Sequence, residues 1–242
     1  MNEVKRLEEK TKALRAAFPH TIPVLTGFLF LSMAYGILME SKGYGLGWIA
    51  LFSIFVYAGS AQYMAINFLV SAFNPIYALL MTLMINARHL FYGISMLERY
   101  GDSGRLKPYL IFGMSDETFS ITCSVDPPAG INKNWFFFFI TFLNQIYWVL
   151  GSILGGLLGP MIAFNTEGLD FVLTALFVVI FLGQWKSNKD HVPASIGVIC
   201  SAICLIIFGP DNFIIPSMIA ISLVLMIYEK EHTKKKRIRE GL

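Results

Sequence analysis

The sequence has little charge. Only 14% of its 242 residues are Asp, Glu, Lys or Arg, and residues 43–87 contain none of these four types. A soluble domain carries about 25% charged residues, whereas the uncharged run would form roughly 68 Å of helix, about twice the hydrocarbon thickness of a bilayer. The net charge of +3 comes mostly from basic residues at the two ends and in short loops. These features exclude an ordinary soluble domain and argue against a nucleic-acid partner.

Cysteine is also scarce, and the usual enzyme motifs are missing. Cys123, Cys200 and Cys204 are an odd number of cysteines in or beside apolar stretches, and no CxxC pair occurs. This pattern predicts neither a disulfide framework nor a haem or metal site. The sequence also lacks HExxH, GxSxG, Walker A and GxGxxG motifs, so we predict a protein that is not an enzyme and needs no cofactor.

What the sequence has is apolar segments, and they predict an all-α, polytopic integral membrane protein with about eight hydrophobic segments. The segments are 18–39, 45–70, 75–97, 108–125, 134–160, 170–185, 192–208 and 212–228. Asn74 and Pro75 form a good helix start. Segments 45–70 and 134–160 have polar and glycine-rich interiors, which are typical of discontinuous or re-entrant helices. For 134–160 a continuous helix with a close-packing glycine face is an equal alternative.

The charge distribution predicts the domains and the topology. We expect an amphipathic cytoplasmic segment at 1–17 (or a solvated tail there), one transmembrane transport domain at 18–228 and a basic cytoplasmic tail at 229–242. If all eight segments cross, the basic loop at 99–107 lies outside, against the positive-inside rule. If 45–70 and 134–160 are re-entrant hairpins, 16 of the 19 basic residues face the cytoplasm, all but Lys42, Arg88 and Lys133. Both models place both termini in the cytoplasm.

Charged residues inside the apolar segments are candidates for proton coupling or an ion pair, because such residues are costly in a membrane. Asp116 and Glu117 are adjacent carboxylates that cannot both stay ionised there without partners. They either couple transport to protons, form a structural salt bridge with Arg88, or belong to a loop on the soluble side. Arg88 has a second alternative, which is to extend its side chain to the membrane surface.

Neutral polar residues near the helix breaks are candidates for substrate binding. Amide side chains and half-helix N-termini suit a zwitterionic ligand, although the same residue types also hold helices together. Gly59 is expected to supply unusual backbone geometry, Ser60 to cap the following helix, and Asn86 and His89 to share one helical face. The candidates are Tyr57, Gly59, Ser60, Gln62, Tyr63, Asn86, His89, Asn144 and Gln145.

Three stretches closely resemble the AzlC family, the large subunits of bacterial branched-chain amino acid exporters. They are residues 57–63 (YAGSAQY), 86–95 (NARHLFYGIS) and 115–119 (SDETF). The resemblance implies a multi-pass carrier in the bacterial cytoplasmic membrane that exports branched-chain amino acids. It also implies a small hydrophobic membrane partner of the AzlD type. From the residues alone, the alternatives are a channel and a membrane scaffold that transports nothing.

Overall fold

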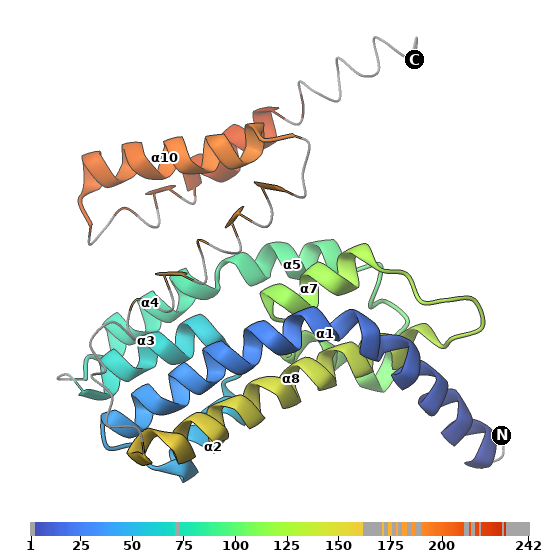
Figure 1. The fold of residues 1–242 in the computed structure, drawn as a ribbon. Coiled ribbons are helices and arrows are strands. Elements are labelled where there is room, and N and C mark those ends of the chain that lie inside the picture. The colour runs from blue at the N-terminus through green and yellow to red at the C-terminus, as the bar shows by residue number, and fades with distance from the viewer. Residues whose placement is uncertain are drawn as a thin grey trace, which may run out of the picture. The chain divides into compact units, whose positions relative to one another are not determined.

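The structure is a computed structural model that describes residues 3–70, 73–161, 190–210 and 219–228, with single residues or pairs between 171 and 186 and between 213 and 230. The described residues form helices and loops without strands, which confirms the all-α prediction. The chain divides into two compact units, Met1–Leu176 and Phe177–Leu242. Figure 1 shows the helices of both units. The single transport domain at 18–228 stays a prediction.

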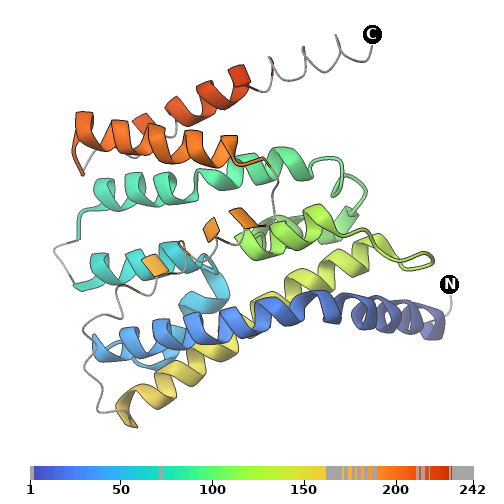
Figure 2. The same ribbon diagram turned by 45° about the horizontal axis from the view of Figure 1, so that its top comes forward.

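Two long helices form the frame of the first unit. They are α1 (Glu3–Ser41) and α8 (Lys133–Leu158), and a short 3-10 helix, η2 (Gly159–Met161), extends α8. Among the described residues, these two helices are long and apolar enough to cross a membrane. Contacts between them rise in order along both: His20 touches Phe136, and Phe28 touches Trp148. The helices therefore lie side by side and parallel (Figures 1 and 2).

The contact between α1 and α8 depends on small residues. A Cβ atom added to Gly151 would overlap the Ser32 hydroxyl, and one added to Gly155 would overlap the Met33 backbone. Small residues at a helix interface let two backbones approach closely. Of the two alternatives for 134–160, the continuous helix with a close-packing glycine face is confirmed and the discontinuous one is wrong, because α8 is one helix whose glycines contact α1. The predicted N-terminal segment 1–17 is likewise continuous with the first apolar segment, because α1 runs through Pro19 and Pro23.

The break predicted within 45–70 is confirmed. Helix α2 (Leu46–Phe55) and helix α3 (Gly59–Val70) are separated by three residues, among which Tyr57 has a φ of 39°. The chain also turns back here, because the Tyr44 hydroxyl before α2 donates to the Leu69 carbonyl at the end of α3, at 2.8 Å. We call α2 and α3 the first hairpin. It enters and leaves at the end of the unit where α1 and α8 finish.

A second hairpin lies in a segment that was predicted to be continuous. Segment 108–125 consists of α6 (Lys107–Phe112), which follows the 3-10 helix η1 (Gly104–Leu106), and α7 (Asp116–Ser124). Arg99 before the hairpin donates to Asp126 after it at 2.6 Å, so the chain returns to the end where it entered. Ser103 of the connecting loop donates to Asn134 at the start of α8. The second hairpin therefore enters from the end opposite to the first.

The segment between the hairpins is also divided. Helix α4 (Pro75–Asn86) begins with Asn74 accepting hydrogen bonds from the N–H groups of Ile76 and Tyr77, as its sequence predicts. A single residue, Ala87, separates α4 from α5 (Arg88–Met96), whereas the sequence predicts one segment over 75–97. Together α4 and α5 connect the end that holds the first hairpin to the end that holds the second (Figure 1).

In the second unit, helix α10 (Val192–Phe208) matches the predicted segment and ends at Gly209, which has a φ of 74°. Ile219–Tyr228 is a further short apolar helix, within the predicted segment 212–228. Most of segment 170–185 and all of the tail except Lys230 lie outside the described residues. Because only α1 and the α8–η2 helix meet the length and hydropathy of a span, the described residues do not confirm eight crossings.

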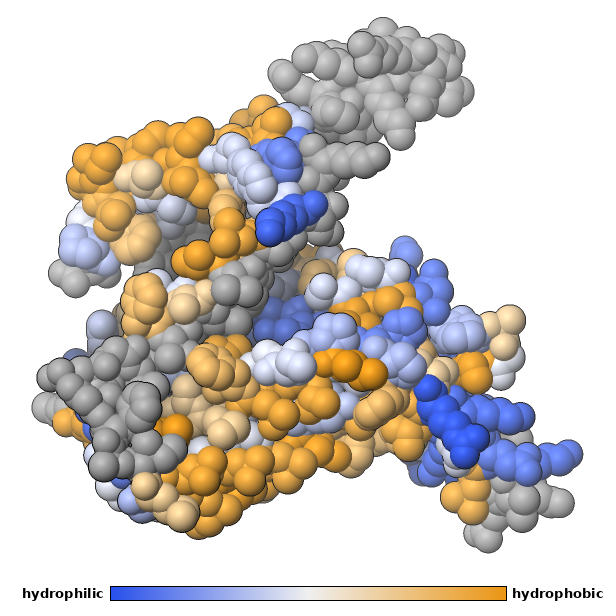
Figure 3. All heavy atoms as spheres, viewed as in Figure 1, coloured by the Kyte–Doolittle hydropathy of each residue, from blue (hydrophilic) through white to orange (hydrophobic). Residues whose placement is uncertain are grey.

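The surface of the first unit carries many apolar side chains. Leu150, Leu154 and Leu157 of α8 are 52%, 44% and 49% exposed, and Figure 3 shows hydrophobic residues gathered over α8 and α2. The N-terminal part of α1 is hydrophilic in the same view. Such a large exposed apolar surface is unfavourable in water and suits a lipid environment.

Candidate functional site

The N-terminal ends of α3, α5 and α7 meet in the middle of the first unit. Arg88, the first residue of α5, donates through Nε to Asp116 Oδ1 of α7 at 2.8 Å. Its Nη2 donates to the Ser60 hydroxyl of α3 at 2.9 Å. One arginine therefore connects both hairpins and the divided segment between them. We call Ser60, Arg88 and Asp116 the central triad.

Asp116 holds a second hydrogen bond on the same oxygen. The Tyr92 hydroxyl donates to Asp116 Oδ1 at 2.6 Å, and the Tyr92 ring stacks on Phe119 at 4.2 Å. The Arg88 and Asp116 side chains are 30% and 21% exposed. This geometry agrees with the ion-pair alternative for Asp116. Both carboxylates belong to the first turn of a helix rather than to a loop, so the loop alternative is wrong.

Glu117 is differently placed from its neighbour. Among the residues that the structure describes, the ion pairs are Arg88–Asp116 and Arg99–Asp126, so Glu117 belongs to neither. Its charge is close enough to interact with Asp116 and Arg88, and with the hydroxyls of Tyr57 and Tyr92. The acidic pair therefore contains one compensated and one uncompensated carboxylate.

Gln62 attaches the first hairpin to α8. It is fully buried, and its Oε1 accepts a hydrogen bond from the Trp148 indole N–H at 2.9 Å. Its Nε2 lies 3.4 Å from the Ser53 hydroxyl on α2. Both ends of the amide are thus used within the protein, which is the pattern of a residue that holds helices together.

Gln145 joins the two hairpins. Its Oε1 accepts from the Tyr109 hydroxyl of α6 at 2.6 Å, and its Nε2 donates to the Ile54 carbonyl of α2 at 3.1 Å. The rings of Tyr57 and Phe112 also face each other across the two hairpin tips, with centroids 6.4 Å apart. The hairpins enter from opposite ends and meet at this level.

Asn144 and Tyr57 bring unpaired polar atoms to the same place. Asn144 is fully buried and donates through Nδ2 to Thr118 Oγ1 at 3.0 Å, while its Oδ1 has no partner among the described residues. Tyr57 is 5% exposed, and its hydroxyl forms no hydrogen bond there either. The hydroxyls of Ser115 and Thr118 lie near that of Tyr57.

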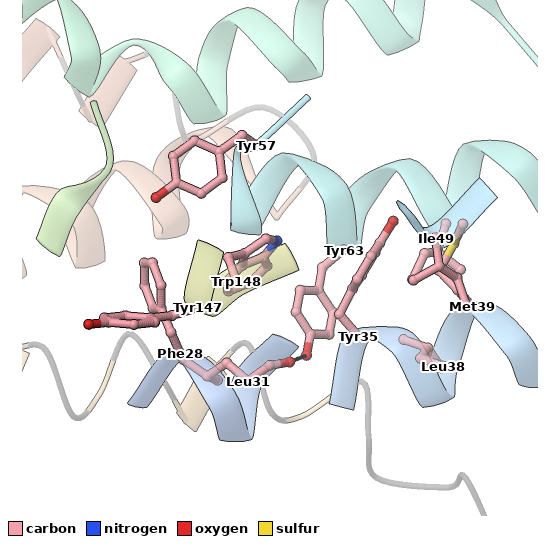
Figure 4. Close-up of a cluster of buried hydrophobic side chains, with 11 residues drawn as sticks. Phe28, Leu31, Tyr35, Leu38, Met39, Ile49, Tyr57, Tyr63, Tyr147 and Trp148 are labelled. Atoms are coloured by element: carbon pink, nitrogen blue, oxygen red, sulfur yellow. Dashed lines mark hydrogen bonds between the residues drawn. The ribbon is translucent and has the colours of Figure 1, made fainter. Parts of the chain in front are cut away.

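Tyr63 lies outside this arrangement. Its hydroxyl donates to the Leu31 carbonyl of α1 at 2.7 Å, and its ring packs edge-on against Tyr35. Figure 4 shows it pointing toward Leu31 within the buried cluster, while Tyr57 points elsewhere. Tyr63 therefore contributes to the packing between α3 and α1.

The expected roles of Gly59 and Ser60 need correction. The residue with a positive φ is Tyr57, whereas Gly59 is the first residue of α3 and has ordinary geometry. Gly59 is small because the Trp148 ring lies against it: an added Cβ would be 2.9 Å from the ring. Ser60 lies inside α3 rather than before it, and its hydroxyl accepts a hydrogen bond from Arg88.

Asn86 and His89 do not form one helical face, because α4 ends at Asn86 and α5 begins at Arg88. The His89 Nδ1 atom lies 3.1 Å from the Asn86 backbone carbonyl, and the His89 ring meets the edge of Tyr92. The Asn86 Oδ1 atom is buried without a partner in the described part of the chain. Both residues thus lie beside the central triad but outside its hydrogen bonds.

Sequence reasoning missed Tyr92, Thr118 and Trp148. Tyr92 follows Arg88 by four residues and Trp148 follows Asn144 by four, so each lies one helical turn from a residue that was identified. Thr118 follows Asp116 by two residues in the sequence. The four-residue spacing was the signal that could have identified Tyr92 and Trp148. It was not used, because in the sequence these two aromatic residues look the same as aromatic residues that face lipid.

Comparisons with known proteins agree with the resemblance to the AzlC family. The model of the AzlC protein family matches residues 23–162, which include the central triad. The chain is 54% identical over 218 residues to the "Branched-chain amino acid transport protein AzlC" of Bacillus subtilis, covering 90% of this chain and 86% of the relative. It is 42% identical to an "Uncharacterized membrane protein" of Haemophilus influenzae, covering 95% of each. It is 24% identical over 178 residues to the "Inner membrane protein YgaZ" of Escherichia coli, covering 70% of this chain and 72% of the relative. No solved structure matches the chain significantly.

Proposed function

The chain belongs to the AzlC family, and from this premise we propose that it is a secondary transporter that exports branched-chain amino acids across the bacterial cytoplasmic membrane. The substrate class comes from the Bacillus relative, whose printed name is a branched-chain amino acid transport protein. Export is the direction that the sequence resemblance implies. A small AzlD-type membrane subunit is proposed as the partner on the same ground.

The observation that carries this proposal is the meeting of two hairpins from opposite ends at the central triad. Half-helix N-termini inside a membrane protein present unpaired N–H groups and the positive ends of helix dipoles, which suit a substrate carboxylate. Helices α3, α5 and α7 each begin there. An apolar pocket distinguishes side chains that differ by one methylene by only about 1–3 kcal/mol, so broad branched-chain specificity is expected.

The proposed topology follows from the shared end of α1, α8 and the basic loop. Asn132, just before α8, donates to Glu9 of α1 at 2.8 Å, and Asn134 contacts the loop that holds Arg99 and Arg105. By the positive-inside rule this end faces the cytoplasm. The first hairpin then enters from outside and the second from inside. Lys133 joins the cytoplasmic basic residues, and the tail after residue 228 is cytoplasmic as well.

Proton coupling is proposed for the acidic pair. Arg88 compensates one of two adjacent carboxylates, so the other can change its charge by binding a proton. Such a group converts a proton gradient into a change in the affinity for the substrate. A channel would need no such exchange, and a scaffold would need neither the acidic pair nor the half-helix ends.

The test is leucine efflux from cells that lack their own exporters and hold this chain with or without its partner subunit. We expect saturable efflux that needs the partner. In Asp116→Asn the efflux per folded protein in the membrane should disappear, even where the destabilised variant is less abundant. Flux that does not saturate would support a channel. If cells with the chain and its partner export leucine no faster than cells without the chain, the proposal is overturned.

A further inference from the structure

The carbonyl oxygen of Asn144 is the first sign of a ligand site. The side chain is fully buried, and only its Nδ2 is used, in a 3.0 Å hydrogen bond to Thr118 Oγ1. A buried acceptor without a donor is unfavourable. Leucine at this position would pack in α8 without that cost. A polar acceptor kept here therefore points to a donor that arrives with a ligand.

The Tyr57 hydroxyl is the second sign, and it is independent of the first. Tyr57 is 5% exposed, it lies in the break of the first hairpin, and its hydroxyl is unpaired in the described part of the chain. Its φ of 39° is a left-handed conformation that is unfavourable for a non-glycine residue. Strain of this kind gathers at functional sites, where the surroundings hold it in place.

Thr118 places these two groups together. It is fully buried in the first turns of α7, it accepts the Asn144 hydrogen bond, and the Tyr57 hydroxyl faces it. Glu117 is the adjacent residue of α7, and its carboxylate lies within electrostatic range of the Tyr57 hydroxyl. An amide oxygen, a phenol oxygen and a carboxylate thus all lie at or beside the first turn of α7, where α8 and the first hairpin approach it.

The charges around that place sum to one negative charge when Glu117 is ionised. Four titratable groups lie within electrostatic range of Glu117: the charged groups of Asp116 and Arg88, and the neutral phenols of Tyr57 and Tyr92. The neutral Ser115 hydroxyl lies beside Glu117 as well. Arg88 and Asp116 compensate each other in their 2.8 Å ion pair. A single uncompensated carboxylate beside neutral oxygen acceptors is the complement of one monovalent cation.

We propose that Glu117, Asn144 and Tyr57 bind the ammonium group of the exported amino acid, and that a proton competes with that group for Glu117. The three N–H bonds of an ammonium match the three oxygen acceptors. When a proton binds the carboxylate, a neutral acid replaces the ion pair and the ammonium leaves. No covalent bond other than the carboxyl O–H forms or breaks. This inference rests on the proposed function and narrows proton coupling to one of the two acidic residues.

The test measures leucine binding by calorimetry on the purified chain with its partner subunit, between pH 5 and 9. Competition with one proton predicts an affinity that rises about tenfold per pH unit at low pH and then levels off. In Glu117→Gln the affinity is expected to fall at least tenfold at pH 8 and to lose its pH dependence. Glu98→Gln, in the turn after α5 and exposed, is the matched control and should behave like the wild type.

Two ligand analogues and one ion separate the possible occupants. Isopentylamine has the ammonium without the carboxylate and should bind with the same pH dependence, whereas 4-methylpentanoate lacks the ammonium and should lose it. Leucine affinity that depends on sodium but not on pH would assign the site to a free sodium ion and overturn the proposal. Tyr57→Phe should weaken leucine binding about tenfold, with Tyr77→Phe on the exposed side of α4 as its control.

The two proposals fail in different ways. If Glu117→Gln keeps the wild-type pH dependence while the wild type still moves leucine in vesicles, the ammonium site is wrong and the transport function stands. If the wild type with its partner neither binds nor moves leucine, the proposed function itself is wrong.

Discussion

Arg88 and Asp116 form a 2.8 Å ion pair between the first residues of two helices, α5 and α7. A carboxylate at a helix N-terminus is favoured by the helix dipole, whereas a guanidinium there is not. Arg88 is therefore tolerated at its position because Asp116 and Ser60 accept its hydrogen bonds. The pair connects the second hairpin to the divided segment before it.

The ion pair predicts a loss of stability when one partner is removed. Asp116→Asn or Arg88→Gln leaves one partly buried charge uncompensated, and should lower the free energy of unfolding by about 1–3 kcal/mol, less than for a fully buried pair. The double variant should be more stable than either single one. Thermal unfolding in detergent measures this. Additive losses in the double variant would show that the two charges do not interact.

The glycine contact between α1 and α8 predicts a position-specific effect. In Gly155→Val the new side chain would overlap the Met33 backbone, so the folded yield should fall strongly. Overpacking of this kind costs about 1–3 kcal/mol or more. Gly27→Val is the control on α1, since nothing lies within 4 Å of its added Cβ. Size-exclusion chromatography in detergent compares the folded fractions. Equal yields for the two variants would contradict the close parallel packing.

Gln62 is predicted to act through the structure rather than by direct contact with the substrate. Gln62→Ala removes the acceptor of the buried Trp148 N–H and should destabilise the protein by about 1–3 kcal/mol. Gln62→Glu keeps an acceptor for that N–H and should retain more of the stability. Thermal unfolding and Trp148 fluorescence report both effects. A Gln62→Ala variant that is as stable as the wild type but fails to bind leucine would return Gln62 to the substrate site.

The start of α1, the end of α7 and the start of α8 lie at one end of the first unit. This arrangement predicts which loops a thiol reagent reaches from the same side of the membrane. In a chain without its native cysteines, Asp102→Cys and Ala129→Cys should both react with a membrane-impermeant thiol reagent only from the cytoplasmic side. Lys42→Cys, beyond the other end of α1, should react only from outside. All three positions are exposed. Labelling of Ala129→Cys from outside would restore the crossing of segment 108–125 that the structure replaces with a hairpin.

The sequence predicted best those features of the fold that depend on local composition alone. The missing charge predicted the apolar helices, and the run around Gly59 predicted the break between α2 and α3. Local composition failed where tertiary contacts decide. The packing role of Gly151 and Gly155 is clear only once Ser32 is placed against the first and the Met33 backbone against the second. The role of Gly113 is likewise clear only from Thr141, which packs on it at the tip of the second hairpin.

The same limit applies to the candidate site. The sequence singled out Ser60, Arg88 and Asp116 by their polarity, but they come from three separate segments, and only the fold brings them together. It could not rank Asp116 against Glu117, because their difference depends on which carboxylate Arg88 reaches. Tyr92 and Thr118 carry no sequence signal strong enough to separate them from other residues of apolar helices.

The central claim is that the amino acid binds where the two hairpins meet, and photo-leucine, a leucine analogue with a diazirine, tests it most directly. After illumination of the chain with its partner, mass spectrometry locates the labelled peptides. We predict labels in residues 53–63 and 112–119 that excess leucine prevents and that Glu117→Gln reduces. Labels confined to α10 or to the exposed face of α8, unaffected by excess leucine, would contradict the account.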